Sequence, residues 1–169
     1  MNVNTDKTDK TEITWHLQML SPEELRPKAL LSDTQLVRLE IPFPALNRFF
    51  YQEVGKLWQW TDRLNWSEEE WHNWVEREKV QTWILLLRGT PAGYFELDDQ
   101  DGNVEIAYFG LLPQFLGIGL GGGFLTAAVE KAWEMGAVRV WVHTCSFDHP
   151  NALKNYQARG FQIYSESLD

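Results

Sequence analysis

The fold is decided by the segment Leu112-Pro-Gln-Phe-Leu-Gly-Ile-Gly-Leu-Gly-Gly-Gly-Phe124. Five of the seven residues from Gly117 to Gly123 are glycine. The segment follows an apolar stretch predicted as a strand, residues 104–112, and precedes a predicted helix that ends near Met135. Glycines let the backbone approach a ligand with its N–H groups turned inward, and the start of a helix adds partial positive charge. The loop therefore predicts a site for a phosphate or pyrophosphate.

Two nucleotide-binding patterns compete for this loop. A P-loop needs Gly-Lys-Ser or Gly-Lys-Thr at its end, and the absence of lysine here excludes it. A dinucleotide fingerprint is formally present as Gly117, Gly119 and Gly122. The context of this match differs from that of a dinucleotide-binding βαβ unit, because the loop follows predicted antiparallel strands and no acidic residue ends the next strand at Thr144. The fingerprint remains the main rival interpretation.

The flanking sequence alternates between strand and helix patterns. Ser67 and Glu70 have the spacing of a capping box, which marks a helix start. Three apolar stretches before the loop are separated by turn residues and predict an antiparallel meander. The predicted strands cover residues 14–19, 80–87, 93–97, 104–112, 138–144 and a last strand from 161, and the predicted helices cover 44–55, 67–77, the loop helix and 151–158.

Residues 104–161, about a third of the chain, resemble the core of GNAT acetyltransferases. The loop of that family has Gln or Arg, two residues, Gly, one residue, and then Gly or Ala. Gln114, Gly117 and Gly119 match this pattern literally. A register two residues later, with Gly119 and Gly121, keeps the usual distance from the preceding proline and places Leu116 at the Gln or Arg position.

The resemblance implies acetyl-CoA as the donor substrate. Its pyrophosphate would lie on the glycine loop, and its pantetheine arm would pair with the backbone at the end of the preceding strand, as an added strand does. The donor-binding residues that the resemblance implies are Leu111, Leu112, Gln114, Leu116, Gly117, Ile118, Gly119, Leu120, Gly121, His149 and Tyr156.

A second motif of the family is matched downstream by Ala152, Tyr156, Gly160 and Phe161. In that motif an Asn precedes the Ala by three residues. His149 occupies the Asn position here, and the resemblance makes it the substitute for the contact of that Asn with pantetheine.

Tyr156 is the predicted general acid. Departing coenzyme A is a thiolate, and a phenol with an ordinary pKa near 10 can donate a proton while staying protonated at neutral pH. The alternative is a tyrosine that only packs on a short helix.

Glu105 is the predicted general base, because an amine acceptor arrives protonated and must lose a proton before it attacks a thioester. It resembles the Glu of family members that acetylate histones. Apolar neighbours would raise the pKa of its carboxyl group. The alternative is a solvated strand end, and Glu96 on the neighbouring strand is the second candidate for the base.

Four residues that can bind metals or act as nucleophiles fall in one segment: His143, Cys145, Asp148 and His149. No second cluster completes a tetrahedral site, so we predict no metal. A Cys–His nucleophile would give a ping-pong mechanism, but residues two apart on a strand share a face and seldom align for proton transfer. Five of the nine tryptophans lie between Trp58 and Trp74, either as core residues or as an aromatic acceptor site.

Composition limits the class of protein. A chain of 169 residues with 44% apolar and 23% charged residues fits one globular domain, predicted at residues 13–169 after a disordered segment at 1–12. No apolar run approaches the roughly 18 residues of a membrane span, and no signal peptide is visible, which predicts a cytoplasmic protein without membrane association. The net charge of -9 argues against a nucleic-acid partner and favours cationic acceptors.

The sequence thus predicts an α/β protein of the mixed α+β type, with helices on both faces of a mostly antiparallel sheet. By resemblance it has the GNAT-type fold, with parallel strands that splay apart around the loop. The expected activity is acetyl transfer from acetyl-CoA to a primary amine of a small molecule or peptide, by direct attack in a ternary complex. The alternative is a domain that senses acyl-CoA without catalysis.

A homodimer is a further expectation. Members of the family commonly end with two strands after the short helix, whereas eight residues follow Phe161 here. The sheet edge left short by this ending needs to be covered by a partner or by another segment.

Overall fold

The computed structural model describes residues 11–169. Most of the segment that is predicted to be disordered, residues 1–12, therefore lies outside the described residues. At its end, Glu12 exchanges two backbone hydrogen bonds with Asp169, at N···O distances of 3.2 and 2.9 Å. Among residues 11–169, no helix combines the length and the apolar character needed to cross a bilayer.

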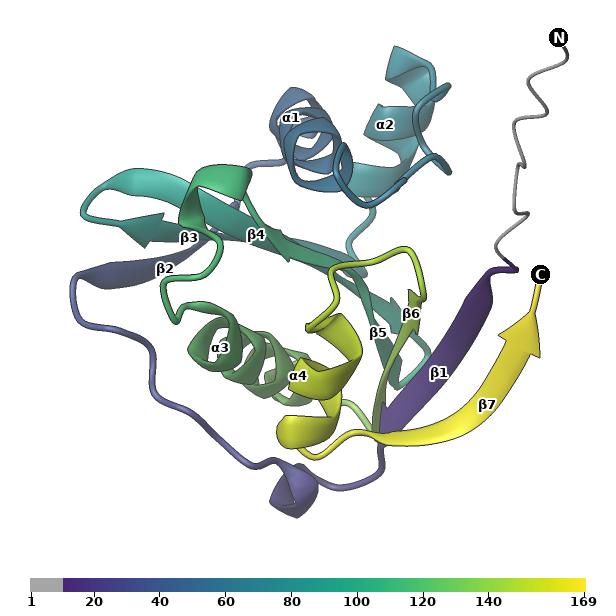
Figure 1. The fold of residues 1–169 in the computed structure, drawn as a ribbon. Helices are drawn as coiled ribbons and strands as arrows, with labels where there is room; N and C mark the ends of the chain where they lie inside the picture. The colour runs from purple at the N-terminus through teal and green to yellow at the C-terminus, as the bar shows by residue number, and fades with distance from the viewer. Residues whose placement is uncertain (1–10) are drawn as a thin grey trace, which may run out of the picture.

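One mixed sheet of seven strands forms the centre of the structure (Figure 1), in the order β2-β3-β4-β5-β6-β1-β7. All neighbouring strands are antiparallel except β5 and β6, which are parallel. The predicted mixed, mostly antiparallel sheet is confirmed. The strands are β1 (Ile13–Met19), β2 (Thr34–Arg38), β3 (Val80–Leu87), β4 (Thr90–Gln100), β5 (Asn103–Leu111), β6 (Arg139–Cys145) and β7 (Gln162–Leu168).

Helices cover both faces of the sheet (Figure 1), with α1 (Pro44–Gly55) and α2 (Glu68–Val75) on one face and α3 (Gly121–Glu134) and α4 (Ala152–Ala158) on the other. The capping box of α2 is present, since Ser67 and Glu70 each accept a hydrogen bond from the backbone of the other. The main core lies between the sheet and α3, which buries Phe124, Leu125 and Val129 there. A smaller core lies under α1.

The sequence patterns do not predict β2. Its five residues include only Leu36 and Val37 as apolar side chains, and it pairs with β3 alone at the edge of the sheet. Such a short strand has no clear alternation of its own, so its strand conformation depends on the neighbouring strand.

The parallel pair β5–β6 separates after three residue pairs, which are Asn103 with Arg139, Val104 with Val140, and Glu105 with Trp141. Immediately beyond, β5 contains a bulge. Its register against β4 changes from Ile106 opposite Leu97 to Tyr108 opposite Glu96, which leaves Ala107 as the extra residue. A bulge bends its strand, so the second half of β5 leaves β6. The predicted splaying of the two strands is confirmed.

The N-terminal strand β1 lies between β6 and β7 and pairs antiparallel with both. Among the described residues, β7 pairs with β1 alone and is the edge strand at this end of the sheet. The expected covering of this edge by a partner or another segment therefore stays a prediction, as does the homodimer. Because residues alternate across a strand, Leu17 and Met19 enter the main core whereas Thr14 and His16 face the opposite side.

Candidate active site

A cleft of about 910 Å³ occupies the gap between the diverging halves of β5 and β6. Its walls come from the glycine loop, the second half of β5, the loop between α1 and α2, the loop after β6, and the ends of β1 and β7. Segments from the whole length of the chain thus meet around one cavity. Its size is that of a site for a large small-molecule ligand.

The glycine loop lies at one end of this cleft, directly before α3. Gly117 and Gly119 have positive φ angles of 75° and 89°, and no atom of residues 11–169 lies within 4 Å of where a Cβ would stand on either residue. The first N–H groups of α3 have no partner within the helix. Open space beside free backbone donors at a helix start fits a pyrophosphate, so the loop fits the predicted donor.

The two registers of the loop motif differ in what they place in the cleft. Leu116, Gly119 and Gly121 of the later register all line it. Gln114 of the literal register is not among the lining residues, and neither is Ile118, whose side chain is 49% exposed. The geometry therefore favours the later register, in which backbone groups rather than a Gln or Arg side chain meet the ligand.

The end of β5 offers one of its two predicted backbone positions to the cleft. The N–H of Leu112 donates to the carbonyl of Ala92 at 2.8 Å, so it faces β4 and is already used. Because backbone groups alternate along a strand, those of Leu111 face the gap. Leu111 also lines the cleft, whereas Leu112 does not. Pairing with a pantetheine amide is thus available at Leu111.

Polar and basic side chains surround the start of α3. Asn155 donates from Nδ2 to the carbonyl of Gly121 at 3.1 Å. A Cβ added to Gly122 would lie 2.5 Å from Nη1 of Arg159 and 2.7 Å from Cδ of Lys28. Sequence reasoning missed both basic residues, because Lys28 comes from a segment 94 positions before Gly122 and carries no motif. Their positive charge favours an anion at this end of the cleft.

Tyr156 lines the cleft from α4 and is 7% exposed. Its ring packs against Phe109 and Phe161, with centroid distances of 6.4 and 5.9 Å. Burial, and to a smaller extent the charge of Asp148, raise the pKa of the Tyr156 phenol well above its usual value. The phenol is therefore protonated throughout the neutral range.

Asp148 has a position that the sequence pattern did not reveal. Its carboxylate accepts hydrogen bonds from the Thr144 hydroxyl at 2.5 Å, the Cys145 backbone at 3.1 Å and the Trp60 indole at 3.1 Å. These donors fix the orientation of the carboxyl group at the wall of the cleft. From the sequence, Asp148 was considered only as a metal ligand, and its place just after a strand end, where functional loops often begin, was the signal for this other role.

His149 also lines the cleft, next to Asp148. Its ring meets the edge of Trp58 at a centroid distance of 4.9 Å, and its Nδ1 accepts a hydrogen bond from the backbone N–H of Asn151 at 3.0 Å. This contact leaves Nε2 for a ligand, which is compatible with the predicted contact to pantetheine.

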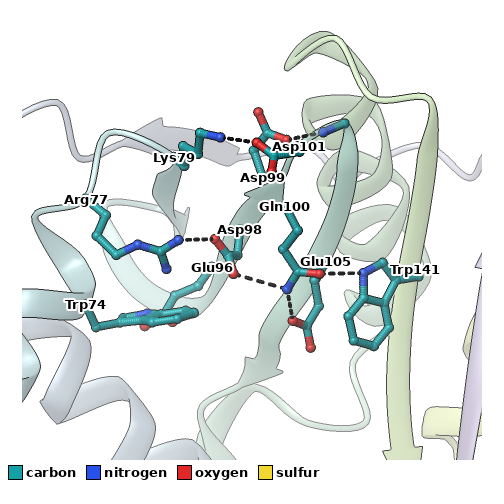
Figure 2. Close-up of polar contacts among 11 residues, drawn as sticks. Trp74, Arg77, Lys79, Glu96, Asp98, Asp99, Gln100, Asp101, Glu105 and Trp141 are labelled. Atoms are coloured by element: carbon teal, nitrogen blue, oxygen red, sulfur yellow. Dashed lines mark hydrogen bonds and ion pairs between the residues drawn. The ribbon is translucent and has the colours of Figure 1, made fainter.

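Glu105 stands beside the cleft but is not among its lining residues. Its side chain is 12% exposed and its Oε1 lies 3.4 Å from Nδ1 of His143. Its Oε2 accepts a hydrogen bond from Gln100 at 2.8 Å (Figure 2). His143 does line the cleft, so the predicted base contacts a residue that sequence reasoning had considered only as a metal ligand or nucleophile partner.

Glu96, the second candidate for the base, has a structural position. Its side chain is fully buried and accepts hydrogen bonds from Asn47, Arg63 and Trp74. With both oxygens occupied and no place in the cleft wall, Glu96 cannot reach an acceptor amine. This carboxylate anchors Arg63 instead.

The tryptophan-rich segment divides between two roles. The guanidinium of Arg63 lies 4.5 Å from the ring centroids of Trp66 and Trp74 and 4.2 Å from that of Tyr108, so these rings enclose an internal cation. Trp58 and Trp60 line the cleft instead. The aromatic acceptor wall is thus smaller than the sequence suggested.

Cys145 lines the cleft as well, and burial raises the pKa of its thiol to about 12. Because the thiolate is the reactive form, this cysteine is unreactive near neutral pH. Among residues 11–169, no group of three or more His, Cys, Asp or Glu side chains is arranged to hold a metal ion.

Comparisons with known proteins agree with this geometry. The family model described as "Acetyltransferase (GNAT) family" matches residues 43–161. No curated protein matches the chain. Similar solved structures include a GCN5-related N-acetyltransferase from Kribbella flavida, with 17% identity over 92% of this chain and 56% of that chain and a TM-score of 0.67. Another is a GCN5-related N-acetyltransferase from Sphaerobacter thermophilus, with 13% identity over 94% of this chain and 50% of that chain and a TM-score of 0.70. An aminoglycoside acetyltransferase from an uncultured soil metagenomic sample is also similar, with 14% identity over 75% of this chain and 87% of that chain and a TM-score of 0.61.

The likeness to these structures shows the fold, and the chain spans about half the length of the first two. The family model covers most of the chain and includes the glycine loop, Glu105 and Tyr156. The chain therefore belongs to the GNAT acetyltransferase family.

Proposed function

We propose that this protein transfers an acetyl group from acetyl-CoA to a primary amine, by direct attack of the amine on the thioester in a ternary complex. The observation that carries this proposal is one continuous cleft that joins the glycine loop, Tyr156 and an acidic, aromatic far end. Family membership supports acyl transfer in general.

The donor would be held by its phosphates and its amide groups. Backbone N–H groups from Leu116 to Gly121 would bind the pyrophosphate, with Lys154 on the cleft wall and Arg159 near the start of α3. Free backbone groups of Leu111 would pair with the pantetheine arm. These contacts orient the thioester, and orientation is a large part of the rate gain in a two-substrate reaction.

Tyr156 would donate a proton to the coenzyme A sulfur. Because the pKa of this phenol is raised by burial, transfer to a fully formed thiolate would be unfavourable. Donation therefore accompanies cleavage of the C–S bond, while negative charge develops on sulfur. Among the described residues, no side chain or backbone group forms a hydrogen bond with the Tyr156 hydroxyl, and the neighbouring side chains bond elsewhere. The hydroxyl is therefore available to the donor.

The acceptor end of the cleft suits a cation. Glu12, Asp62, Asp148 and Asp169 line this cavity, together with the aromatic rings of Trp58 and Trp60. Negative charge attracts an amine in its protonated form. Such an acceptor requires a base, and Glu105, which lies on this side of the sheet, is proposed to draw the proton directly or through an intervening group.

The experiment that tests the function measures release of coenzyme A thiol from acetyl-CoA. The acceptor panel contains putrescine, 2-phenylethylamine, a peptide with a free N-terminus and an aminoglycoside, the last because one similar structure is an aminoglycoside acetyltransferase. We expect amine-dependent release, and Tyr156→Phe should lower kcat by on the order of 10²-fold with nearly unchanged affinity for acetyl-CoA.

Two results would contradict the proposal. Tight binding of acetyl-CoA without release with any amine would favour the alternative, a non-catalytic acyl-CoA sensor. Binding of NADH in place of acetyl-CoA would favour the dinucleotide fingerprint of the loop. The cytoplasmic location and the homodimer are kept as predictions, and light scattering measures the latter.

A further inference from the structure

Three titratable residues from three neighbouring strands meet at the acceptor side of the cleft. His143 on β6 and His16 on β1 are directly opposite each other in the antiparallel register, with ring centroids 5.7 Å apart. Both line the cleft. Their sequence neighbours Leu17 and Val142 are buried in the main core, so the alternation of strand residues directs both imidazoles to the opposite side of the sheet.

A chain of polar contacts fixes the side chain of Glu105 on β5 (Figure 2). Arg77 pairs with Asp98 at 3.2 Å, and Gln100 donates both to Asp98 at 3.2 Å and to Glu105 at 2.8 Å. Trp141 in turn donates its indole N–H to the side-chain oxygen of Gln100 at 3.2 Å. One carboxylate oxygen of Glu105 is thereby occupied, and the other is left for Nδ1 of His143.

This arrangement favours one tautomer of His143. An ionised carboxylate can only accept a hydrogen bond, so the contact with Oε1 of Glu105 favours the form in which Nδ1 of the imidazole carries the hydrogen. The other ring nitrogen, Nε2, then has a free lone pair. Because Glu105 is 12% exposed and His143 is 45% exposed, the imidazole rather than the carboxylate is accessible to a substrate.

We propose, on the basis of the function proposed above, that His143 is the base that takes the proton from the acceptor amine and that Glu105 acts through it as a positioning residue. Nε2 of His143 accepts one proton from the ammonium group. The freed nitrogen lone pair forms the C–N bond as the C–S bond breaks. The ammonium loses two protons overall. The first leaves His143 for solvent, and the second restores the Tyr156 phenol after Tyr156 has protonated the sulfur of coenzyme A.

The charges around His143 suit this role. Its hydrogen bond with Glu105 raises the pKa of His143, burial opposes that shift, and the charges of Glu105, Asp148 and Asp62 raise it further. The pKa of His16 is lowered by burial and by His143, against smaller opposing effects of Glu105 and Asp169. His143 is therefore the more basic imidazole of the pair, and Glu105 stabilises the imidazolium that forms.

The pH dependence follows from the direction of these shifts. A base works only in its neutral form, so the rate rises with pH through a pKa above the ordinary His value of about 6.5. Glu105→Gln removes the largest cause of the raised pKa. The ascending limb of kcat/KM should then move to lower pH in this variant, with a smaller loss of rate than in His143→Gln.

The test compares pH profiles of kcat/KM with 2-phenylethylamine, or with a faster amine of the same panel, from pH 6 to 9.5. His143→Gln should lose on the order of 10²-fold at pH 7, and this deficit should shrink as pH approaches the pKa of the free amine. His72→Gln is the matched control, because His72 is a surface residue of α2 that pairs with Glu76 just after the helix. It should behave as the wild type.

A second readout is independent of turnover. The chain has four histidines, so their ring C–H signals can be titrated individually by NMR, and His143→Gln assigns the signal of interest. We expect His143 to titrate above 6.5 in the wild type and lower in Glu105→Gln. A titration of His143 that Glu105→Gln leaves unchanged would overturn the positioning role.

The outcomes separate this inference from the proposed function. An active wild type with a His143→Gln variant of equal rate and equal pH profile would overturn the role of His143 alone. A loss in His143→Gln that is constant with pH would show a structural role. A wild type that transfers acetyl to no amine would overturn the proposed function and the role of His143 together, while the NMR titration would still report on the Glu105 contact.

Discussion

Glu96→Gln is expected to destabilise the fold strongly, although the substitution changes one atom. The carboxylate is 0% exposed and receives hydrogen bonds from three side chains. Oε2 accepts from Arg63 at 2.8 Å and from Trp74 at 2.8 Å, whereas Oε1 accepts from Asn47 at 2.9 Å and from Arg63 at 3.2 Å.

A glutamine cannot replace these contacts. In either orientation its NH2 group faces donors, so about half of the hydrogen bonds are lost, and Arg63 remains a buried cation without a counter-ion (5% exposed). Breaking a buried ion pair by removing one partner costs about 3–5 kcal/mol. The contacts of the guanidinium with the surrounding aromatic rings are present in both proteins, so they do not offset this loss.

The measurement is the free energy of unfolding from urea titrations, followed by tryptophan fluorescence and by circular dichroism. Glu53→Gln is the matched control, because Glu53 on α1 forms an exposed pair at 2.8 Å with Lys56, the residue that follows the helix. It should cost less than about 1 kcal/mol. A Glu96→Gln variant within about 1 kcal/mol of the wild type would refute the structural role of this carboxylate.

Two further predictions concern the cleft. Gly119→Val should weaken acetyl-CoA binding in calorimetry by at least about tenfold, because a side chain would fill the open space beside the loop. Gly89→Val is the strain-matched control, because this hairpin glycine has a similar φ of 81° and, among the described residues, no atom within 4 Å of an added Cβ. Equal affinities of the two variants for acetyl-CoA would contradict binding of the donor at the glycine loop. Cys145→Ala should keep kcat within about twofold below pH 9, because the thiol with its pKa of about 12 is not a nucleophile there; a large loss would reinstate a covalent mechanism.

Much of the fold was predictable because its signals are local. The capping box of α2, the proline and glycine that bound α1, and the alternation in β1 each act within one turn or one strand. The glycine loop is local too, since its backbone freedom and its place before a helix need no distant contact. Tyr156 was found because a motif of fixed spacing in the short helix places it, and the structure puts it in the cleft wall.

The same local reasoning could not locate the partners of the carboxylates. Glu105 and Glu96 are both acidic residues on neighbouring strands, and nothing in their own segments distinguishes them. Their roles separate only in three dimensions, where Glu96 meets Arg63 from the loop after α1 and Glu105 meets His143 from β6. The pairing depends on which strands become neighbours and on the side to which each side chain points.

The sequence by itself determined the family, the loop that suits a phosphate and the mixed sheet, because each depends on residue types at short, fixed spacings. Only the tertiary structure decided that β1 lies between β6 and β7, which sets His16 opposite His143 and brings Glu12 beside the last residue, Asp169. Strand order and register depend on the balance of many weak long-range contacts across the whole sheet, and no single segment of the sequence carries that information.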